Sequence, residues 1–338
     1  MASKRWGAQS IRFQNPPVIL SHAAIVGKKE GEGPLGPFFD RVEADDTLGQ
    51  KSWEKAESLL VENAVTMAVQ KAGLEVNDID LLLGGDLLNQ IVSASFAARQ
   101  LQMPYLGLYG ACSTMAESLL VGACMVDGGF AATAACVTVS HFSTAERQYR
   151  FPLELGSTRS PTAQWTVTGS GATLLGESGT GLVVAGATPG KVRDYGIKDA
   201  ANMGAAMAPA AADTLVAHFQ DTGRQPSDYD LVLTGDLGIV GKELLIELME
   251  QSGYQIKEQL MDCGCEIFTS DQDVHAGGSG CGCAASVLNG WVLPRMEQGA
   301  YRRILFMATG ALLSPITTQQ GETIPGIAHA VIIERGDL

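Results

Sequence analysis

The sequence lacks long hydrophobic runs, an excess of basic residues and a high content of aromatic residues. No apolar run approaches the roughly 20 residues that a membrane-spanning helix needs, and no apolar core follows the first basic residues. We therefore expect neither a transmembrane segment nor a signal peptide. The formal net charge of −14 argues against general nucleic-acid binding, because that needs a basic surface. Only 6% of residues are aromatic while glycine occurs 40 times, which suits helices packed closely on a sheet.

Cysteine is also sparse, with seven residues in a chain of 338. An odd number in a long chain predicts reduced thiols of an intracellular compartment rather than a disulfide framework. Two Cys-Gly-Cys pairs raise the question of zinc, but structural zinc sites favour roughly two to four residues between paired cysteines. The sequence therefore predicts packing in a glycine-rich loop and no metal at the four residues Cys263, Cys265, Cys281 and Cys283.

Several segments predict an alternating α/β order. Residues 17–26 are expected to form a first strand, and 52–71 a helix whose first turn Asp45 or Asp46 would cap. Within 77–86 a short, wholly apolar strand is typical of a parallel sheet that is buried on both faces. A further strand at 134–140 ends next to His141.

An internal repeat divides the chain into two similar halves. Residues 73–87 and 223–237 are identical at eight of fifteen positions, and looser matches continue beyond them around an insertion at 250–271. We expect residues 1–179 and 180–338 to form two α/β halves that pack about a pseudo-twofold axis. The functional site would lie where loops of both halves meet.

Cys112 is expected at the point where an extended segment turns into a helix. An apolar run ends at Tyr109, and from residue 115 to 126 apolar residues recur at three- and four-residue steps, the period of a helix with one buried face. A thiol at a helix start has a lowered pKa, so Cys112 could be a nucleophile or line an anion site. The alternative is simple burial, which is common for free cysteine.

A duplicated α/β chain with a cysteine at this position resembles the thiolase and ketoacyl-synthase superfamily. Within it, the sequence is similar to the stage V sporulation AD family of spore-forming bacilli. The motifs that carry this similarity are GPLGPFFD, GDLLNQ, GACSTMAESL, TAERQYRFP, VTGSGA, MGAAMAPAAADTL, GGSGC and ATGALLSP. The resemblance implies a thiolase-like fold of two mixed five-stranded sheets with αβαβα layering, and a homodimer.

The same resemblance implies a function. Members of that family bind dipicolinic acid (pyridine-2,6-dicarboxylate), alone or as the calcium chelate, for its uptake into spores and its release in germination. They work with membrane proteins of the same operon, which implies a peripheral location at the spore inner membrane. The resemblance implies no cofactor other than the calcium of the chelate.

The sequence departs from the enzymes of the superfamily. A condensing enzyme needs, besides the cysteine, a His with a second His or an Asn from the second half. Here the corresponding loops read TGDLGI, with Asp236, and AGGSGCGC. These departures favour a non-catalytic binding protein. Two alternatives remain: an acyl transferase that uses Cys112 on acyl-CoA or acyl-carrier substrates, and a ligand-free scaffold subunit of a membrane channel.

A pocket for dipicolinate needs cationic or N–H donors at two ends and a flat apolar slot between them. Arg147 and Arg150 follow a strand end and would suit the carboxylates, although they could instead pair with nearby acids. Asp86 and Asp236 would be calcium ligands or, alternatively, would anchor their own turns. The full candidate set is Cys112, His141, Arg147, Arg150, Asp86, Asn89, Asp236, His275, Ser279 and His329.

Overall fold

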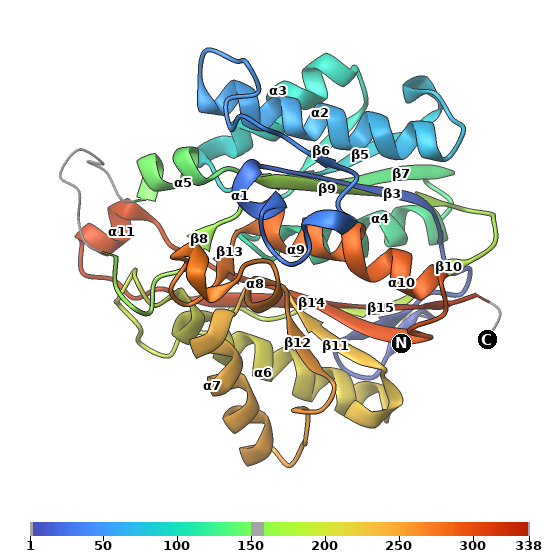
Figure 1. Cartoon of the computed structure of the whole chain (residues 1–338). Coiled ribbons are helices and arrows are strands. Elements are labelled where there is room, and N and C mark those ends of the chain that lie inside the picture. The colour runs from blue at the N-terminus through green and yellow to red at the C-terminus, as the bar shows by residue number, and fades with distance from the viewer. Residues whose placement is uncertain (1–2, 150–158, 337–338) are drawn as a thin grey trace.

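The computed structural model describes residues 3–149 and 159–336, and it contains two stacked β-sheets (Figure 1). The first sheet runs through β3 (Val18–Val26), β9 (Gly169–Gly176), β7 (Thr133–Ser140), β5 (Leu81–Gly85) and β6 (Tyr105–Gly107). The second runs through β10 (Leu182–Thr188), β15 (Gly326–Arg335), β14 (Arg303–Ala311), β11 (Leu231–Thr234) and β12 (Leu260–Asp262). A single pairing of Val18 with Val183 joins the two ladders. The predicted α/β fold with two five-stranded sheets is confirmed.

The two sheets have the same mixture of strand directions. In the first, β5 is parallel to β6 and β7, whereas β9 is antiparallel to β7 and β3. In the second, β11 is parallel to β12 and β14, whereas β15 is antiparallel to β14 and β10. Each strand therefore has a counterpart in the other sheet, as expected for a duplicated unit.

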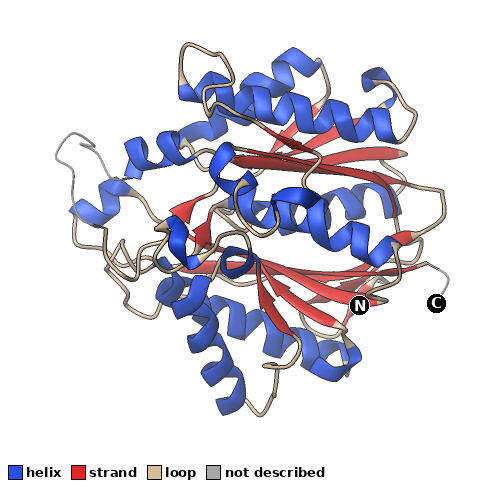
Figure 2. Cartoon of the chain, viewed as in Figure 1, coloured by secondary structure: helices blue, strands red, loops and turns tan. Residues whose placement is uncertain are grey.

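Helices form three layers around the sheets (Figures 1 and 2). Above the first sheet lie α2 (Trp53–Lys71) and α3 (Val92–Leu101), and below the second lie α6 (Met203–Thr222) and α7 (Gly238–Gln251). Between the sheets lie α4 (Thr114–Asp127), α9 (Cys281–Val287), a π-helical turn (Leu288–Val292) and α10 (Leu293–Glu297). The predicted αβαβα layering is thus present.

Shorter elements complete the described structure. The strands are β1 (Arg5–Trp6), β2 (Ser10–Arg12), β4 (Arg41–Val42), β8 (Trp165–Thr166) and β13 (Gly278–Ser279). The helices are α1 (Lys28–Gly31), α5 (Phe142–Tyr149), α8 (Cys263–Glu266) and α11 (Pro315–Gln319). Single 3-10 turns occupy Gly36–Phe38, Val76–Asp78, Asn89–Ile91, Pro226–Asp228 and Ser270–Gln272.

The predicted helix after the first loop is present as α2, but its predicted cap is wrong. Ser52 is the N-cap, since its Oγ accepts a hydrogen bond from the Lys55 N–H at 3.4 Å. Asp45 instead accepts from the backbone N–H groups of Thr47 and Gly49 and closes its own turn. A serine directly before the first helical residue competes better than an aspartate several residues upstream.

Two pairs of repeated aspartates have the same structural roles in the two halves. Asp78 and Asp228 each accept the backbone N–H three residues earlier, at 2.8 and 2.7 Å, and so cap equivalent 3-10 turns. Asp80 accepts from the backbone at Ala132, before β7, while Asp230 accepts from the backbone of Arg303 in β14. In both halves the repeated aspartates therefore tie one strand to the start of its parallel neighbour.

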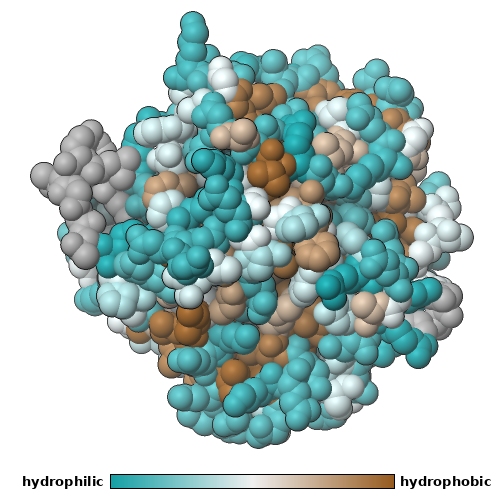
Figure 3. Space-filling view, in the orientation of Figure 1, coloured by the Kyte–Doolittle hydropathy of each residue, from teal (hydrophilic) through white to brown (hydrophobic). Residues whose placement is uncertain are grey.

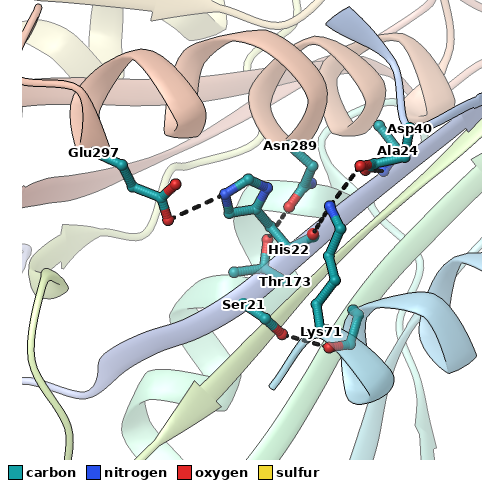
Figure 4. Close-up of polar contacts among 9 residues, drawn as sticks. Ser21, His22, Ala24, Asp40, Lys71, Thr173, Asn289 and Glu297 are labelled. Atoms are coloured by element: carbon teal, nitrogen blue, oxygen red, sulfur yellow. Dashed lines mark hydrogen bonds and ion pairs between the residues drawn. The ribbon is translucent and has the colours of Figure 1, made fainter. Parts of the chain in front are cut away.

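Polar contacts fasten the first sheet to the middle helices (Figure 4). The buried Thr173 Oγ1 of β9 donates to Asn289 Oδ1 at 2.6 Å, and His22 Nε2 of β3 lies 3.3 Å from Glu297 Oε1 of α10. Asn289 also donates from Nδ2 to the Ala285 carbonyl at 2.8 Å. The same carbonyl also accepts from the Leu288 N–H, at the point where the helix widens into its π turn.

The surface viewed in Figure 3 is mostly hydrophilic, with small hydrophobic groups scattered across it. Within residues 3–149 and 159–336, none of the helices combines the length and the apolar character that crossing a bilayer requires.

We predict that Thr173→Val lowers the free energy of unfolding by about 1–3 kcal/mol, because it leaves the buried Asn289 Oδ1 without its donor. Chemical denaturation followed by circular dichroism would measure the change. Thr180→Val, at an exposed threonine, is the matched control and should change the free energy by less than about 0.5 kcal/mol. Equal effects of the two substitutions would contradict the prediction.

Candidate functional site

A cavity of about 220 Å³ lies beside the start of α4, between segments of both halves of the chain. Apolar side chains form most of its wall, among them Leu87, Ala111, Ala163, Ala311 and Leu313. The polar and ionisable side chains on it are Cys112, Glu146, Tyr149, Arg159, Ser160, Thr166 and Ser279. Thr166 and Ser279 come from β8 and β13, which pair in parallel across the two halves. The cavity therefore exists only when the two halves are packed together.

Cys112 lies at the predicted turn between an extended segment and a helix. Ala111, the residue before Cys112, has a positive φ of 51°. Helix α4 begins at Thr114, two residues after Cys112. Gly310 of β14 packs so closely here that a Cβ atom on it would lie 2.2 Å from the Gly110 carbonyl oxygen. This close approach fixes the loop before α4 against the second sheet and leaves Cys112 only 6% exposed.

Asp236 lies directly against Cys112 and is fully buried. Its Oδ2 accepts from the Gly280 N–H at 2.8 Å and its Oδ1 accepts from Thr309 Oγ1 at 3.0 Å, while the Cys112 thiol donates to the same carboxylate. Gly280 has a φ of 102°, which a glycine adopts readily. Three elements of the chain thus hold this carboxylate beside the thiol.

The electrostatics of this contact disfavour a thiolate. Burial raises the pKa of the Cys112 thiol well above its usual value, and the negative charge of Asp236 raises it further. Burial likewise raises the pKa of Asp236, to about 7, although its hydrogen-bond donors oppose the shift. The prediction that the helix start lowers the thiol pKa is therefore wrong, because burial and a neighbouring carboxylate outweigh the dipole.

The two repeated aspartates do not have equivalent roles. Asp86 accepts from the backbone N–H groups of Leu88 and Ala94, both at 2.7 Å, and so holds its own loop. In the second half Asp262 holds the corresponding loop, since it accepts from the N–H groups of Leu237 and Gly238. The Asp236 side chain is thereby released from its loop and points to Cys112 instead.

A second buried acid, Glu57, neighbours Asp86. Glu57 Oε2 accepts from Ser93 Oγ at 2.9 Å, and burial followed by the charge of Asp86 raises the pKa of Glu57 well above its usual value. Burial also raises the pKa of Asp86, to about 6. Neither acid lines the cavity.

The three candidate histidines do not line the cavity. His141 is fully buried: its Nε2 donates to the Asp46 carbonyl at 2.8 Å and its Nδ1 accepts from the Ser143 N–H, while burial lowers its pKa. His329 accepts from the Gly190 N–H, and burial lowers its pKa to about 4. His275 contacts the Ser160 carbonyl at 2.7 Å outside the cavity.

The other candidates are divided between the cavity and its surroundings. Ser279 lines the cavity together with Cys112. Arg147 lies outside it, paired with Glu54, in a separate surface hollow that Asn89 also lines. Arg150 falls outside the described residues.

Sequence reasoning missed Arg159, which lines the cavity. Its Nη2 donates to the Gln164 carbonyl at 2.6 Å, and its guanidinium carbon lies 4.8 Å from the centre of the Trp165 ring. Trp165 is itself stacked on Phe142 at 3.8 Å, and Lys29 Nζ lies 4.1 Å from its ring centre. The only signal in the sequence was a basic residue among small polar residues, STRSPT, just before a short strand.

The described residues include no group of three or more His, Cys, Asp or Glu side chains arranged to hold a metal ion. All seven cysteines, including the two Cys-Gly-Cys pairs, are free thiols.

Comparison with solved structures shows that the fold is thiolase-like. The fold is similar to a variant of OleA from Xanthomonas campestris bound with cerulenin, with a TM-score of 0.61 and 16% identity over 95% of this chain and 97% of that one. It is also similar to 3-oxoacyl-(acyl carrier protein) synthase III from Pseudomonas aeruginosa, with a TM-score of 0.55 and 14% identity over 95% and 98% of the two chains. Identities this low show a shared fold alone.

Sequence comparison gives the family within that class. The family model described as Stage V sporulation protein AD (SpoVAD) matches residues 7–334. A curated relative from Bacillus subtilis (strain 168), "Stage V sporulation protein AD", is 48% identical over 332 residues, which cover 98% of each chain. The chain belongs to the stage V sporulation protein AD family.

We predict that alkylation of Cys112 by iodoacetamide is slow at neutral pH and accelerates only well above the usual pKa of a thiol. Asp236→Asn removes the neighbouring charge, lowers the thiol pKa and should speed alkylation at a fixed pH by about tenfold for each unit of pKa lost. Mass spectrometry across a pH series would measure both rates. Cys124, a half-buried thiol in α4, is the internal control, and its rate should not change. An unchanged pH profile for Cys112 in Asp236→Asn would contradict the assignment.

Proposed function

We propose that this protein binds dipicolinic acid in the cavity beside Cys112, for uptake into spores and release in germination, without catalysing acyl transfer. The observation that carries the proposal is the composition of the cavity. Among the described residues it combines one arginine and one glutamate with four hydroxyl groups and apolar walls, and these residues include no histidine or asparagine. A flat, doubly charged aromatic ligand needs this combination, whereas a condensing reaction needs the residues that this wall lacks.

Arg159 suits one carboxylate of the ligand. Its planar guanidinium can donate two parallel hydrogen bonds, and its contact with Trp165 restrains the side chain before a ligand arrives. The hydroxyl groups of Ser160, Thr166 and Ser279 are neutral donors for the remaining carboxylate oxygens. The ring would lie against the alanine and leucine side chains of the wall.

The calcium chelate is compatible with the same cavity. Glu146 lies on the wall, so it offers a carboxylate oxygen to the calcium of a bound chelate. The sequence left Asp86 and Asp236 either as calcium ligands or as anchors of their own turns. Neither lies on this wall, and both hydrogen-bond to the protein. The chelate would therefore be held by Arg159 at a carboxylate and by Glu146 at the metal.

The state of Cys112 argues against the alternative of acyl transfer. A nucleophilic cysteine reacts as the thiolate, and burial together with Asp236 favours the protonated thiol here. An ionised aspartate beside the thiol would also repel the oxyanion that forms during acyl transfer. In the proposed function Cys112 is part of the binding wall.

We further propose that the protein acts as a homodimer, peripheral to the spore inner membrane, with membrane proteins of its own operon as partners. Strand β6 ends the first sheet, so one of its edges is unpaired among the described strands. Leu106 and Tyr109 on or beside this strand are each 44% exposed, and Phe96 of α3 is 48% exposed. An exposed apolar edge strand is suited to antiparallel pairing with a second copy.

Isothermal titration with dipicolinate, with and without calcium, tests the proposed ligand. We expect saturable binding that pyridine-2-carboxylate, with one carboxylate, does not reproduce. Arg159→Gln should weaken binding by at least about thirtyfold, equivalent to about 2 kcal/mol, because it removes the charged donor. Arg159→Lys keeps the charge and should lose less of the affinity for dipicolinate. Arg147→Gln is the matched control and should bind normally.

Two results would overturn the proposed function. Absence of dipicolinate binding would favour a ligand-free scaffold, and turnover of an acyl-CoA that disappears in Cys112→Ala would favour an acyl transferase.

Analytical ultracentrifugation tests the proposed dimer. We expect the wild-type protein to sediment as a dimer and Leu106→Asp to shift it toward the monomer, because a buried carboxylate at the pairing edge is unfavourable. Val192→Asp, at another exposed apolar residue, should leave the dimer intact. A monomeric wild-type protein would contradict the proposal.

A further inference from the structure

The N-terminal segment has a charge opposite to that of the rest of the chain. The net charge of the whole chain is −14, yet the first acidic residue is Glu30, and Lys4, Arg5 and Arg12 precede it. In the structure this segment forms a hairpin in which β1 pairs with β2, and β2 continues onto β10 of the second sheet. The hairpin therefore presents a local positive charge on an acidic protein.

The hairpin is firmly anchored on the body of the protein. Asp221, in α6, accepts from the backbone N–H groups of Ala8, Gln9 and Ser10, each at 2.7 Å. Lys4 pairs with Asp127 at the end of α4 at 2.8 Å. Because the anchors come from two different layers, the backbone of the hairpin is fixed before any partner binds.

A buried chain of hydrogen bonds extends this support. Ser10 Oγ lies 2.8 Å from Thr188 Oγ1, which lies 2.8 Å from His218 Nδ1. On the other side of the ring, His218 Nε2 lies 2.6 Å from the hydroxyl of Tyr229, to which Arg224 Nη1 donates at 3.2 Å. The chain thus connects β2 to the arginine that lies against the hairpin.

A surface hollow of about 560 Å³ lies beside β1. Two guanidinium groups lie near the Trp6 ring, with the Cζ atoms of Arg12 and Arg224 at 5.4 and 5.3 Å from its centre. Arg5 and Phe13 also line or border the hollow. An aromatic ring with cations beside it makes a flat, partly apolar surface that carries positive charge.

The charges of the hollow are not balanced. Its acidic residue, Glu334, is paired with Arg303 at 2.6 Å and lies 3.9 Å from Arg224. Arg5 and Arg12 are exposed, and within residues 3–149 and 159–336 neither forms an ion pair. Two guanidinium groups therefore remain available to carboxylates from outside.

Strand β1 also has a free edge. Among the described strands it pairs only with β2, so its other side has backbone N–H and C=O groups without a strand partner. An extended peptide can add to such an edge through main-chain hydrogen bonds, while its side chains occupy neighbouring pockets.

We propose that the hollow beside β1 binds an extended acidic segment of a partner protein, which adds a strand to β1 and places carboxylates on Arg5 and Arg12. A concave site with a strand edge suits a peptide better than a flat lipid surface. Two free arginines are also fewer than the roughly four to eight basic residues that recruit a protein to anionic lipid. The site is separate from the Cys112 cavity, so the proposal does not depend on dipicolinate binding.

Fluorescence polarisation with a labelled, acetylated peptide of alternating Glu and Val residues tests this proposal on the full-length protein. We expect saturable binding that weakens as salt is added, and no binding of a peptide of alternating Lys and Val residues. The double substitution Arg5→Gln and Arg12→Gln should weaken binding by about tenfold or more. The control pair Lys51→Gln and Arg99→Gln removes the same net charge elsewhere on the surface and should bind as the wild type does.

A charge-reversal variant distinguishes loss of the binding site from misfolding of the protein. The double variant Arg5→Glu and Arg12→Glu should no longer bind the Glu–Val peptide and should bind the Lys–Val peptide instead. Its melting temperature should be that of the wild type. Three results would overturn the proposal. The first is no binding of the Glu–Val peptide, and the second is that the control pair loses as much affinity for it as the Arg5→Gln and Arg12→Gln pair does. The third is hairpin-dependent binding to phosphatidylglycerol vesicles without peptide binding.

Discussion

The contact between Cys112 and Asp236 joins the two halves of this protein at its candidate site. The thiol comes from the first half and the carboxylate from the second, and Gly280 and Thr309 supply the donors that hold the carboxylate in place. Both groups are almost completely buried, so their charged forms are disfavoured and the thiol stays protonated. A fold shared with condensing enzymes therefore contains a cysteine in a setting that disfavours the nucleophilic form.

This contact is possible because Asp236 and Asp262 have different roles in the second half. A carboxylate at the end of a parallel strand usually holds its own loop by accepting backbone N–H groups, as Asp86 does. In the second half Asp262, from the neighbouring strand, performs that task, so Asp236 can turn toward the other half. The two halves thus differ at this side chain although their strands have the same arrangement.

In both the cavity and the N-terminal hairpin, an arginine side chain lies against a tryptophan ring. Trp165 and the Gln164 carbonyl restrain Arg159, and Trp6 with its neighbouring arginines forms a comparable platform on β1. A restrained arginine loses less conformational entropy on binding a carboxylate. In an acidic protein such positions can select anionic ligands locally against the overall charge.

The sequence by itself determined the α/β class, the two halves, the first strands and helices and the turn at Cys112. These features follow from local periodicity and from an internal repeat, which depend on neighbouring residues. The stage V sporulation motifs likewise indicated the family that the comparisons show. Only the tertiary structure decided the state of the thiol, because burial and the approach of Asp236 join residues far apart in the chain. For the same reason it placed Arg159 on the cavity and Arg147 outside it, a choice that spacing along the chain does not encode.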